Sequence, residues 1–72
     1  MNSEYQIVFY DSRLEDVENF IEQGGYGQNI YRIDDNYGDI VVETITMDED
    51  DFWEMYDYLY ETWGDMVDFN PY

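Results

Sequence analysis

Uncompensated negative charge limits how this chain can fold. Nineteen Asp and Glu residues face only two cations, Arg13 and Arg32, which gives a formal net charge of −17 for 72 residues. Self-repulsion of this kind opposes a compact state, and disordered acidic chains are poor in aromatics. Here 44% of the residues are hydrophobic and 21% are aromatic, so material for a core is present. We therefore expect one folded, acidic domain over residues 1–72.

The first part of the chain predicts a strand followed by a helix. Residues 4–10 are rich in β-branched and aromatic side chains that alternate as they do in a strand. Ser12 followed by Glu15 matches a capping box, in which the two side chains satisfy free backbone N–H groups at a helix start. Apolar residues then recur at helical spacing, and Gly24 and Gly25 are expected to end the helix.

Two further strands are expected to form a hairpin. Residues 29–34 and 39–47 have strand composition, and the turn between them, at 35–38, holds Asn and Gly, which tolerate positive φ. Glu43 interrupts the apolar alternation of the third strand. A bulge, or a sheet that is only partly covered, would explain this, and the pattern leaves open whether Glu43 faces the core or solvent.

A second helix is predicted over residues 48–63, because Asp48 is a good N-cap and apolar side chains recur at intervals of three and four. Gly64 is the expected end. Residues 65–72 contain a proline and show no clear period. The element order is therefore β-α-β-β-α. The simplest packing is an α+β fold in which both helices cover one face of a three-stranded antiparallel sheet.

The residue types that most often carry catalysis are missing. The sequence has no His, Cys or Lys, and its only serines are Ser3 and Ser12, so no activated nucleophile with its usual base can be assembled. Pairs of carboxylates will occur by chance among 19 acids, but so small a core offers little burial to separate their pKa values. We expect no catalytic residue, no cofactor and no enzymatic activity.

Residues 34–39 superficially resemble a calcium-binding loop but fail its ligand pattern. Counted from Asp34, the fifth position is Gly38, where Asp or Asn is required, and the twelfth is Ile45, where Glu is required. A polar hairpin turn explains this segment. The acids at 48–51 are explained by a capped helix start, so no metal site is expected.

Charge and hydropathy also restrict the partners. No apolar run approaches the roughly 20 residues that span a bilayer, and no signal peptide is visible. Carboxylates in this number repel nucleic-acid phosphates and anionic membrane surfaces. We expect a cytoplasmic protein that binds neither nucleic acid nor membrane directly. Like charge favours a monomer, although exposed aromatics leave a dimer open.

Acids on the second helix recur every three or four residues, opposite its apolar stripe. Successive members rise by about 4.5–6 Å along the axis, and each strand of duplex DNA presents one phosphate per roughly 3.4 Å. A solvated face of a soluble protein is the plain alternative. Because the chain has no lysine to relieve the repulsion, we favour a functional anionic surface that meets a basic protein. The candidate partner-binding residues are Asp50, Glu54, Asp57, Tyr58, Glu61 and Asp65 on the second helix, Glu15, Glu18 and Glu22 on the first, and Asp34, Asp35 and Asp39 at the hairpin.

Aromatic residues belong to the same hypothesis. Tyr and Trp are frequent anchors of protein interfaces. Tyr10, Tyr31, Tyr37, Trp53 and Tyr58 are more than a core of this size can enclose. Partial burial at the rim of the core is the alternative for each of them.

In its length, absence of lysine, acid-lined second helix and abundant tyrosine, the chain resembles the small DNA-mimic proteins of bacteriophages and mobile elements, which include anti-CRISPR and anti-restriction proteins. The resemblance covers the whole chain and rests on no shared motif. It implies that the protein occupies the basic DNA-binding groove of a CRISPR effector complex, in the host bacterial cytoplasm, and blocks target DNA. The alternatives are an anti-restriction DNA mimic, and an acidic immunity protein or antitoxin that neutralises a basic nuclease.

Overall fold

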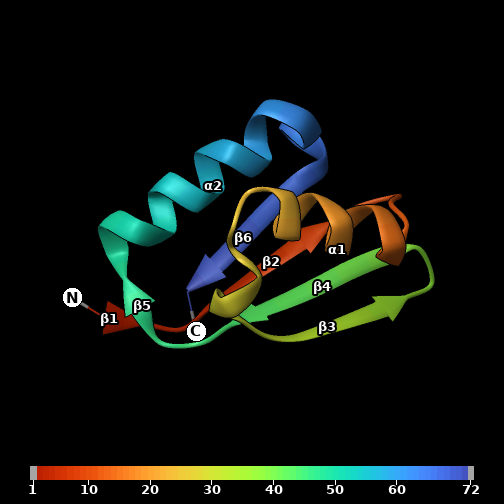
Figure 1. Ribbon diagram of the computed structural model, residues 1–72. Coiled ribbons are helices and arrows are strands. Elements are labelled where there is room, and N and C mark those ends of the chain that lie inside the picture. Colours follow the sequence, from red (N-terminus) through yellow and green to blue (C-terminus); the bar gives the residue numbers. More distant parts are fainter. Residues whose placement is uncertain (1, 72) are drawn as a thin grey trace.

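The computed structural model describes residues 2–71 and has an α+β architecture of two layers (Figure 1). Both helices lie on one face of a four-stranded antiparallel sheet, in the strand order β3-β4-β2-β6. A separate two-stranded ribbon, β1 with β5, joins the start of the chain to the start of the second helix. The elements are β1 (Asn2–Ser3), β2 (Tyr5–Phe9), α1 (Leu14–Gln23), the 3-10 turn η1 (Gly27–Asn29), β3 (Ile30–Asn36), β4 (Asp39–Thr44), β5 (Met47–Asp48), α2 (Glu49–Trp63), the 3-10 turn η2 (Gly64–Met66) and β6 (Val67–Pro71).

The predicted three-stranded sheet is wrong in one element, because the C-terminal segment forms a fourth main strand. β6 pairs with β2 along five residues, from Phe9 opposite Val67 to Tyr5 opposite Pro71. β4 lies between the parallel strands β2 and β3, and β2 lies between the parallel strands β4 and β6. The main sheet and helices therefore form two interleaved split βαβ units in the order β-α-β-β-α-β, the ferredoxin-like arrangement.

The core lies between the sheet and the two helices. The strands contribute alternate residues to it, as the period of two requires, while α1 and α2 contribute residues at helical spacing. The fully buried side chains are Ile7, Phe9, Val17, Ile21, Ile40, Val42, Phe52, Met55 and Leu59. Phe52 stacks on Tyr5 of β2 with ring centroids 3.8 Å apart. All of these contacts lie on one side of the sheet, so the helices leave its other face open.

The predicted capping box at the start of α1 is wrong. Arg13 occupies the N-cap position and makes no side-chain cap hydrogen bond. The hydroxyl of Ser12 instead donates to the carbonyl of Tyr10 (2.9 Å) and accepts a hydrogen bond from Trp63 Nε1 (3.0 Å). Since Trp63 lies at the end of α2, Ser12 ties the start of one helix to the end of the other.

The end of α1 confirms the glycine signal. The Gly25 N–H donates to the carbonyl of Glu22 (3.0 Å) and the Tyr26 N–H donates to that of Ile21 (3.1 Å), with Gly25 at φ 80°. This pair of bonds is a Schellman motif, which needs a residue in the left-handed region. Gly24 has an ordinary φ of −79° and serves another purpose. A Cβ at this position would lie 2.5 Å from Cε2 of Tyr58, so the tyrosine ring packs directly on the glycine.

Replacing Gly24 by Ala is expected to destabilise the domain by about 1–3 kcal/mol, the usual cost of overpacking. Tyr58 cannot move aside cheaply, because its ring stacks on Phe20 and its hydroxyl donates to the Phe20 carbonyl (2.9 Å). Gly27→Ala is the matched control, since a Cβ there makes an ordinary contact at 3.6 Å. Urea unfolding of both variants measures the difference, and equal stability of the two would contradict the close packing of Tyr58 on Gly24.

At α2, both predicted boundaries are confirmed. The Asp48 carboxylate accepts a hydrogen bond from the Asp50 N–H at 2.8 Å, which caps the helix. Gly64, with φ 53°, ends it. The third predicted strand is shorter than expected: β4 ends at Thr44, and β5 follows after a break at Ile45 and Thr46. Thr44 is buried, and its hydroxyl accepts a hydrogen bond from the Tyr5 N–H (3.0 Å).

Glu43 lies on the open face of the sheet, which settles the question left by the sequence. Its neighbours along β4, Val42 and Thr44, are buried, whereas Glu43 is half-buried opposite Gln6 of β2 and Arg32 of β3. The expected irregularity is present, but the register shift lies in β3, between Ile30 and Arg32. The burial of β4 alternates regularly through Glu43, so the open face of the sheet explains the polar residue and the bulge in β3 does not.

Candidate partner-binding surface

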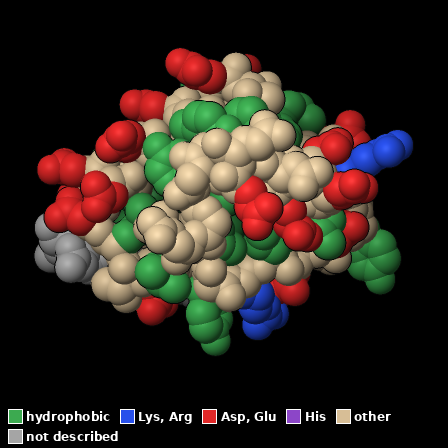
Figure 2. Space-filling model, in the orientation of Figure 1, with side chains coloured by type: hydrophobic (Ala, Val, Ile, Leu, Met, Phe, Trp, Pro, Cys, Tyr) green, Lys and Arg blue, Asp and Glu red, His purple; other side chains and the backbone are tan. Residues whose placement is uncertain are grey.

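Four carboxylates follow the outward face of α2, and we call Asp50, Glu54, Asp57 and Glu61 the α2 acidic stripe. All four side chains are exposed, whereas Phe52, Met55 and Leu59 on the opposite side of the helix are buried. A row of acidic side chains is visible along α2 at the upper left of Figure 2. Because the stripe spans residues 50–61, it extends over about 16 Å of helix axis at 1.5 Å per residue.

In the part of the chain that the structure describes, no cation pairs with the α2 acidic stripe. None of its carboxylates makes a hydrogen bond or ion pair within residues 2–71. The basic side chains lie at the right and lower margins of Figure 2, away from α2. Arg13 is at the N-cap of α1, and Arg32 on β3 forms an ion pair with Asp34 (2.6 Å). That hydrogen bond, together with the charges of Asp34 and Glu43, raises the pKa of Arg32 above its ordinary value.

The positions of the stripe residues within α2 show which of the four carboxylates stabilise the helix and which do not. Asp50 lies in the first turn, where a negative charge favourably meets the positive end of the helix dipole. Glu61 lies in the last turn, where a carboxylate is unfavourable and where no basic residue stands. Glu54 and Asp57 repel their neighbours at intervals of three and four residues. Folding therefore gives no reason for the carboxylates at 54, 57 and 61.

Two residues that the sequence assigned to this surface lie elsewhere. Asp65 is exposed but belongs to η2, beyond the end of α2 at Gly64. Tyr58 is half-buried between the helices, stacked on Phe20 with its hydroxyl bonded to the Phe20 carbonyl. The structure thus gives Tyr58 a role in packing α2 against α1. The other four predicted exposed aromatics are exposed, namely Tyr10, Tyr31, Tyr37 and Trp53.

The three predicted acids of α1 form a different surface. Glu15, Glu18 and Glu22 are all exposed. Glu18 and Glu22 border a depression of about 260 Å³ between α1 and β3, which Arg32 also lines. The α1 acids therefore flank β3, where a cation stands nearby, and do not continue the α2 acidic stripe.

The hairpin acids form hydrogen bonds or an ion pair with residues close to them in the structure. Asp34 pairs with Arg32, and Asp35 Oδ1 accepts a hydrogen bond from the Gly38 N–H (3.1 Å). Asp39 Oδ1 accepts a hydrogen bond from the Asp11 N–H at 3.4 Å. The turn itself places Gly38 at φ 90° and Tyr37 at φ 56°. These bonds account for the three acids as structural parts of the hairpin, and no partner protein is needed to explain them.

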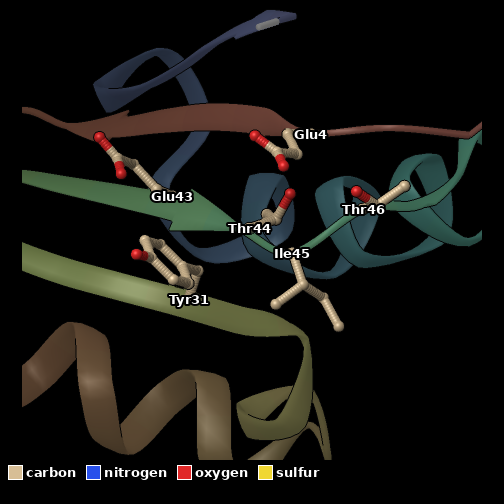
Figure 3. A pocket seen from close by; sticks show the side chains of 6 residues that line it. All are labelled: Glu4, Tyr31, Glu43, Thr44, Ile45 and Thr46. Carbon is tan, nitrogen blue, oxygen red and sulfur yellow. The ribbon is translucent and has the colours of Figure 1, made fainter.

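A notch that the sequence did not suggest lies where β3 and β4 approach the start of β2 (Figure 3). Its volume is about 560 Å³. The lining side chains are Glu4, Tyr31, Glu43, Thr44, Ile45 and Thr46. The bulge in β3 precedes Arg32 and leaves Tyr31 exposed at the notch. Within residues 2–71 no group of three or more His, Cys, Asp or Glu side chains is close enough to hold a metal ion.

Comparison with models of protein families, with characterised proteins and with solved structures found no match for this chain. Among residues 2–71, no helix combines the length and the apolar character needed to cross a membrane.

Proposed function

We propose that this protein is a DNA mimic that inhibits a nucleic-acid-binding protein by occupying its basic DNA-binding groove. The observation that carries the proposal is the α2 acidic stripe, a row of exposed carboxylates that pair with no cation among residues 2–71. It acts by occlusion, as a monomer in the cytoplasm, and catalyses no reaction. The α1 acids and the hairpin acids add to the field that steers a basic partner toward the protein.

The geometry of α2 supports this proposal. The stripe residues are three or four positions apart, so their spacing along the axis is about 4.5–6 Å, of the same order as the phosphate spacing on one DNA strand. The helix is held against the sheet by Phe52, Met55 and Leu59, all fully buried. A rigid helix loses little conformational freedom on binding, which favours affinity.

A CRISPR effector complex is the target that we favour, in keeping with the resemblance to anti-CRISPR proteins. Such effectors read a short duplex motif with arginine side chains and hold nucleic acid in a positively charged channel. The α2 acidic stripe is complementary to such a channel in charge. An anti-restriction protein would use the same surface against another DNA-binding enzyme.

Competition with DNA tests the proposal directly. The tagged protein captures its partner from a bacterial lysate, mass spectrometry identifies it, and duplex DNA is then titrated into the purified complex. We expect the duplex to displace the protein. Affinity for the partner should also fall steeply with salt, because the Debye length shrinks from about 30 Å at 0.01 M to about 3 Å at 1 M ionic strength.

A partner that binds DNA and this protein at the same time would contradict the mimic proposal. That result would favour an immunity protein or antitoxin, which can neutralise a nuclease without covering its DNA site. Partner binding that is insensitive to salt would also contradict it, since the proposed contact is between exposed charges.

A further inference from the structure

A row of four aromatic rings, two of them exposed, lies beside the α2 acidic stripe, on the flank of α2 that faces β6. We call Trp53, Tyr56, Tyr60 and Phe69 the aromatic ladder. Its rings follow one another in contact: Trp53 packs edge-on against Phe69 (4.8 Å) and against Tyr56 (5.6 Å), and Tyr56 is tilted toward Tyr60 (6.0 Å). Trp53 is 40% exposed and Tyr60 is 47% exposed. In Figure 1, α2 and β6 lie next to each other, as their contacts require.

The inner part of the ladder fixes the outer part. Tyr56 and Phe69 are half-buried and contact each other at 4.8 Å. Trp53 also meets the buried Phe52 edge-on at 5.4 Å, and its indole N–H donates to Glu49 (3.5 Å). The Trp53 ring is therefore held by contacts on several sides while much of its surface stays open. A ring held in this way is a preorganised contact surface.

Two carboxylates lie within electrostatic range of Tyr56 in the ladder. Asp57, in the α2 acidic stripe, follows Tyr56 in sequence, and Asp68 lies on β6 between Val67 and Phe69. Burial raises the pKa of the Tyr56 hydroxyl, and the charges of Asp68 and Asp57 raise it further, which places both carboxylates within electrostatic range of this ring. The exposed rings of Trp53 and Tyr60 therefore lie beside a residue, Tyr56, that is in a negative field.

From this arrangement we infer that the aromatic ladder is a docking surface for arginine side chains of the basic partner, which stack on Trp53 and Tyr60 while Asp57 and Asp68 balance their charge. The inference rests on the proposed function and names the cation that its partner presents. Arginine fits better than lysine, because its planar guanidinium stacks on aromatic faces and is more weakly hydrated than an ammonium. A second copy of this chain is disfavoured as the occupant, because it would bring a further formal charge of −17.

Two peptides of equal length and charge, an oligo-arginine and an oligo-lysine, test the inference by calorimetric titration. Simple attraction to the carboxylates predicts equal affinity for both. Because a guanidinium stacks on aromatic faces better than an ammonium does, stacking on two rings predicts that the wild-type protein binds the arginine peptide more tightly, by at most about thirtyfold, the full cation–π contribution of two exposed rings. Equal affinities in the wild type would overturn the inference.

Variants assign the arginine preference to the ladder. Trp53→Leu with Tyr60→Leu keeps apolar bulk but removes the two exposed π faces, and it is expected to abolish the preference while retaining most binding of oligo-lysine. Thermal melts monitored by circular dichroism verify that the variant is folded. A preference that persists in this folded variant would overturn the inference.

Two matched controls complete the experiment. Tyr31→Ala with Tyr37→Asn removes two exposed aromatics remote from α2, with Asn chosen because it tolerates the positive φ at 37. This control should keep the arginine preference, and its loss there would contradict the assignment to the ladder. Asp50→Asn with Glu54→Gln and Glu61→Gln should weaken both peptides and keep their ratio. If that ratio collapses, the stripe and not the ladder sets the preference.

The outcome is separable from that of the proposed function. The ratio of affinities for the two peptides is measured without DNA and without an identified target. The DNA-mimic proposal is tested by competition with duplex DNA. A wild-type ratio near one with intact DNA competition rejects the ladder alone. A clear arginine preference without DNA competition rejects the DNA mimic and retains the arginine-binding surface.

Discussion

Replacing Glu54, Asp57 and Glu61 together by Gln, Asn and Gln is expected to weaken partner binding by roughly threefold to a hundredfold. Each exposed ion pair across an interface contributes about 0.2–1 kcal/mol, so three lost pairs give about 0.6–3 kcal/mol, and 1.4 kcal/mol is a factor of ten in affinity. The partner captured from lysate serves as the ligand in a titration at fixed ionic strength. Unchanged affinity would show that the α2 acidic stripe is not the contact surface.

The same triple variant should be at least as stable as the wild type. The three carboxylates have no partner within residues 2–71, and like charges at intervals of three and four cost a few tenths of a kcal/mol per pair on a helix. Removing Glu61 also relieves the negative end of the helix dipole. Thermal melts should therefore show an equal or higher Tm, so that a loss of binding cannot be assigned to unfolding.

A matched variant on α1 separates the stripe from total charge. Changing Glu15, Glu18 and Glu22 to Gln removes the same number of charges from a surface that flanks β3. We expect a smaller loss of affinity than for the α2 variant. An equal loss in both would mean that overall charge, without a defined surface, drives binding.

Ending the chain after Met66 is expected to abolish the folded state. This truncation removes β6, uncovers the edge of β2, and takes the buried Val67 and the half-buried Phe69 from the core. A domain of this length has a total stability of about 4–11 kcal/mol at 0.05–0.15 kcal/mol per residue. The lost burial and pairing are of comparable size. Circular dichroism should show no cooperative thermal transition.

Point variants on β6 measure how much individual side chains of this strand contribute to the free energy of unfolding. Phe69→Ala removes ring contacts to Phe52, Trp53 and Tyr56 and should cost about 2–3 kcal/mol, somewhat below the value for a fully buried ring. Asn70→Ala, at an exposed neighbouring position, should change stability by less than about 0.5 kcal/mol. A truncated chain that still unfolds cooperatively would mean that the three-stranded sheet expected from the sequence is sufficient.

β6 escaped prediction because its signal is short and non-local. Val67 and Phe69 face the core while Asp68 and Asn70 do not, so the alternation of a strand is present. Five residues with a proline at one end are nevertheless also typical of a loose terminal segment. The strand forms because β2 has an unpaired edge, and no residue within the segment encodes that edge.

Ser12 and Tyr58 show the same limit at single side chains. The sequence around Ser12 predicts a capping box from residues three positions apart, yet its hydroxyl bonds to Trp63, which is 51 positions away. Tyr58 is of a residue type that often anchors interfaces, yet its ring packs on Gly24. In both cases a partner brought by the tertiary fold takes the group that the local pattern assigned elsewhere.

The acidic surface of α2 follows from local sequence alone. The helical period of 3.6 residues separates Asp50, Glu54, Asp57 and Glu61 from the buried side of the helix wherever that helix packs, because the period is a property of the local backbone. The groups that lie beside those carboxylates depend on how the elements pack together. This packing set the α1 acids against β3, bound the hairpin acids into their turn, and brought β6 against α2, since each of these contacts joins segments distant in sequence. The aromatic ladder exists for that reason, and the acidity of the chain thereby acquires a defined border of exposed rings.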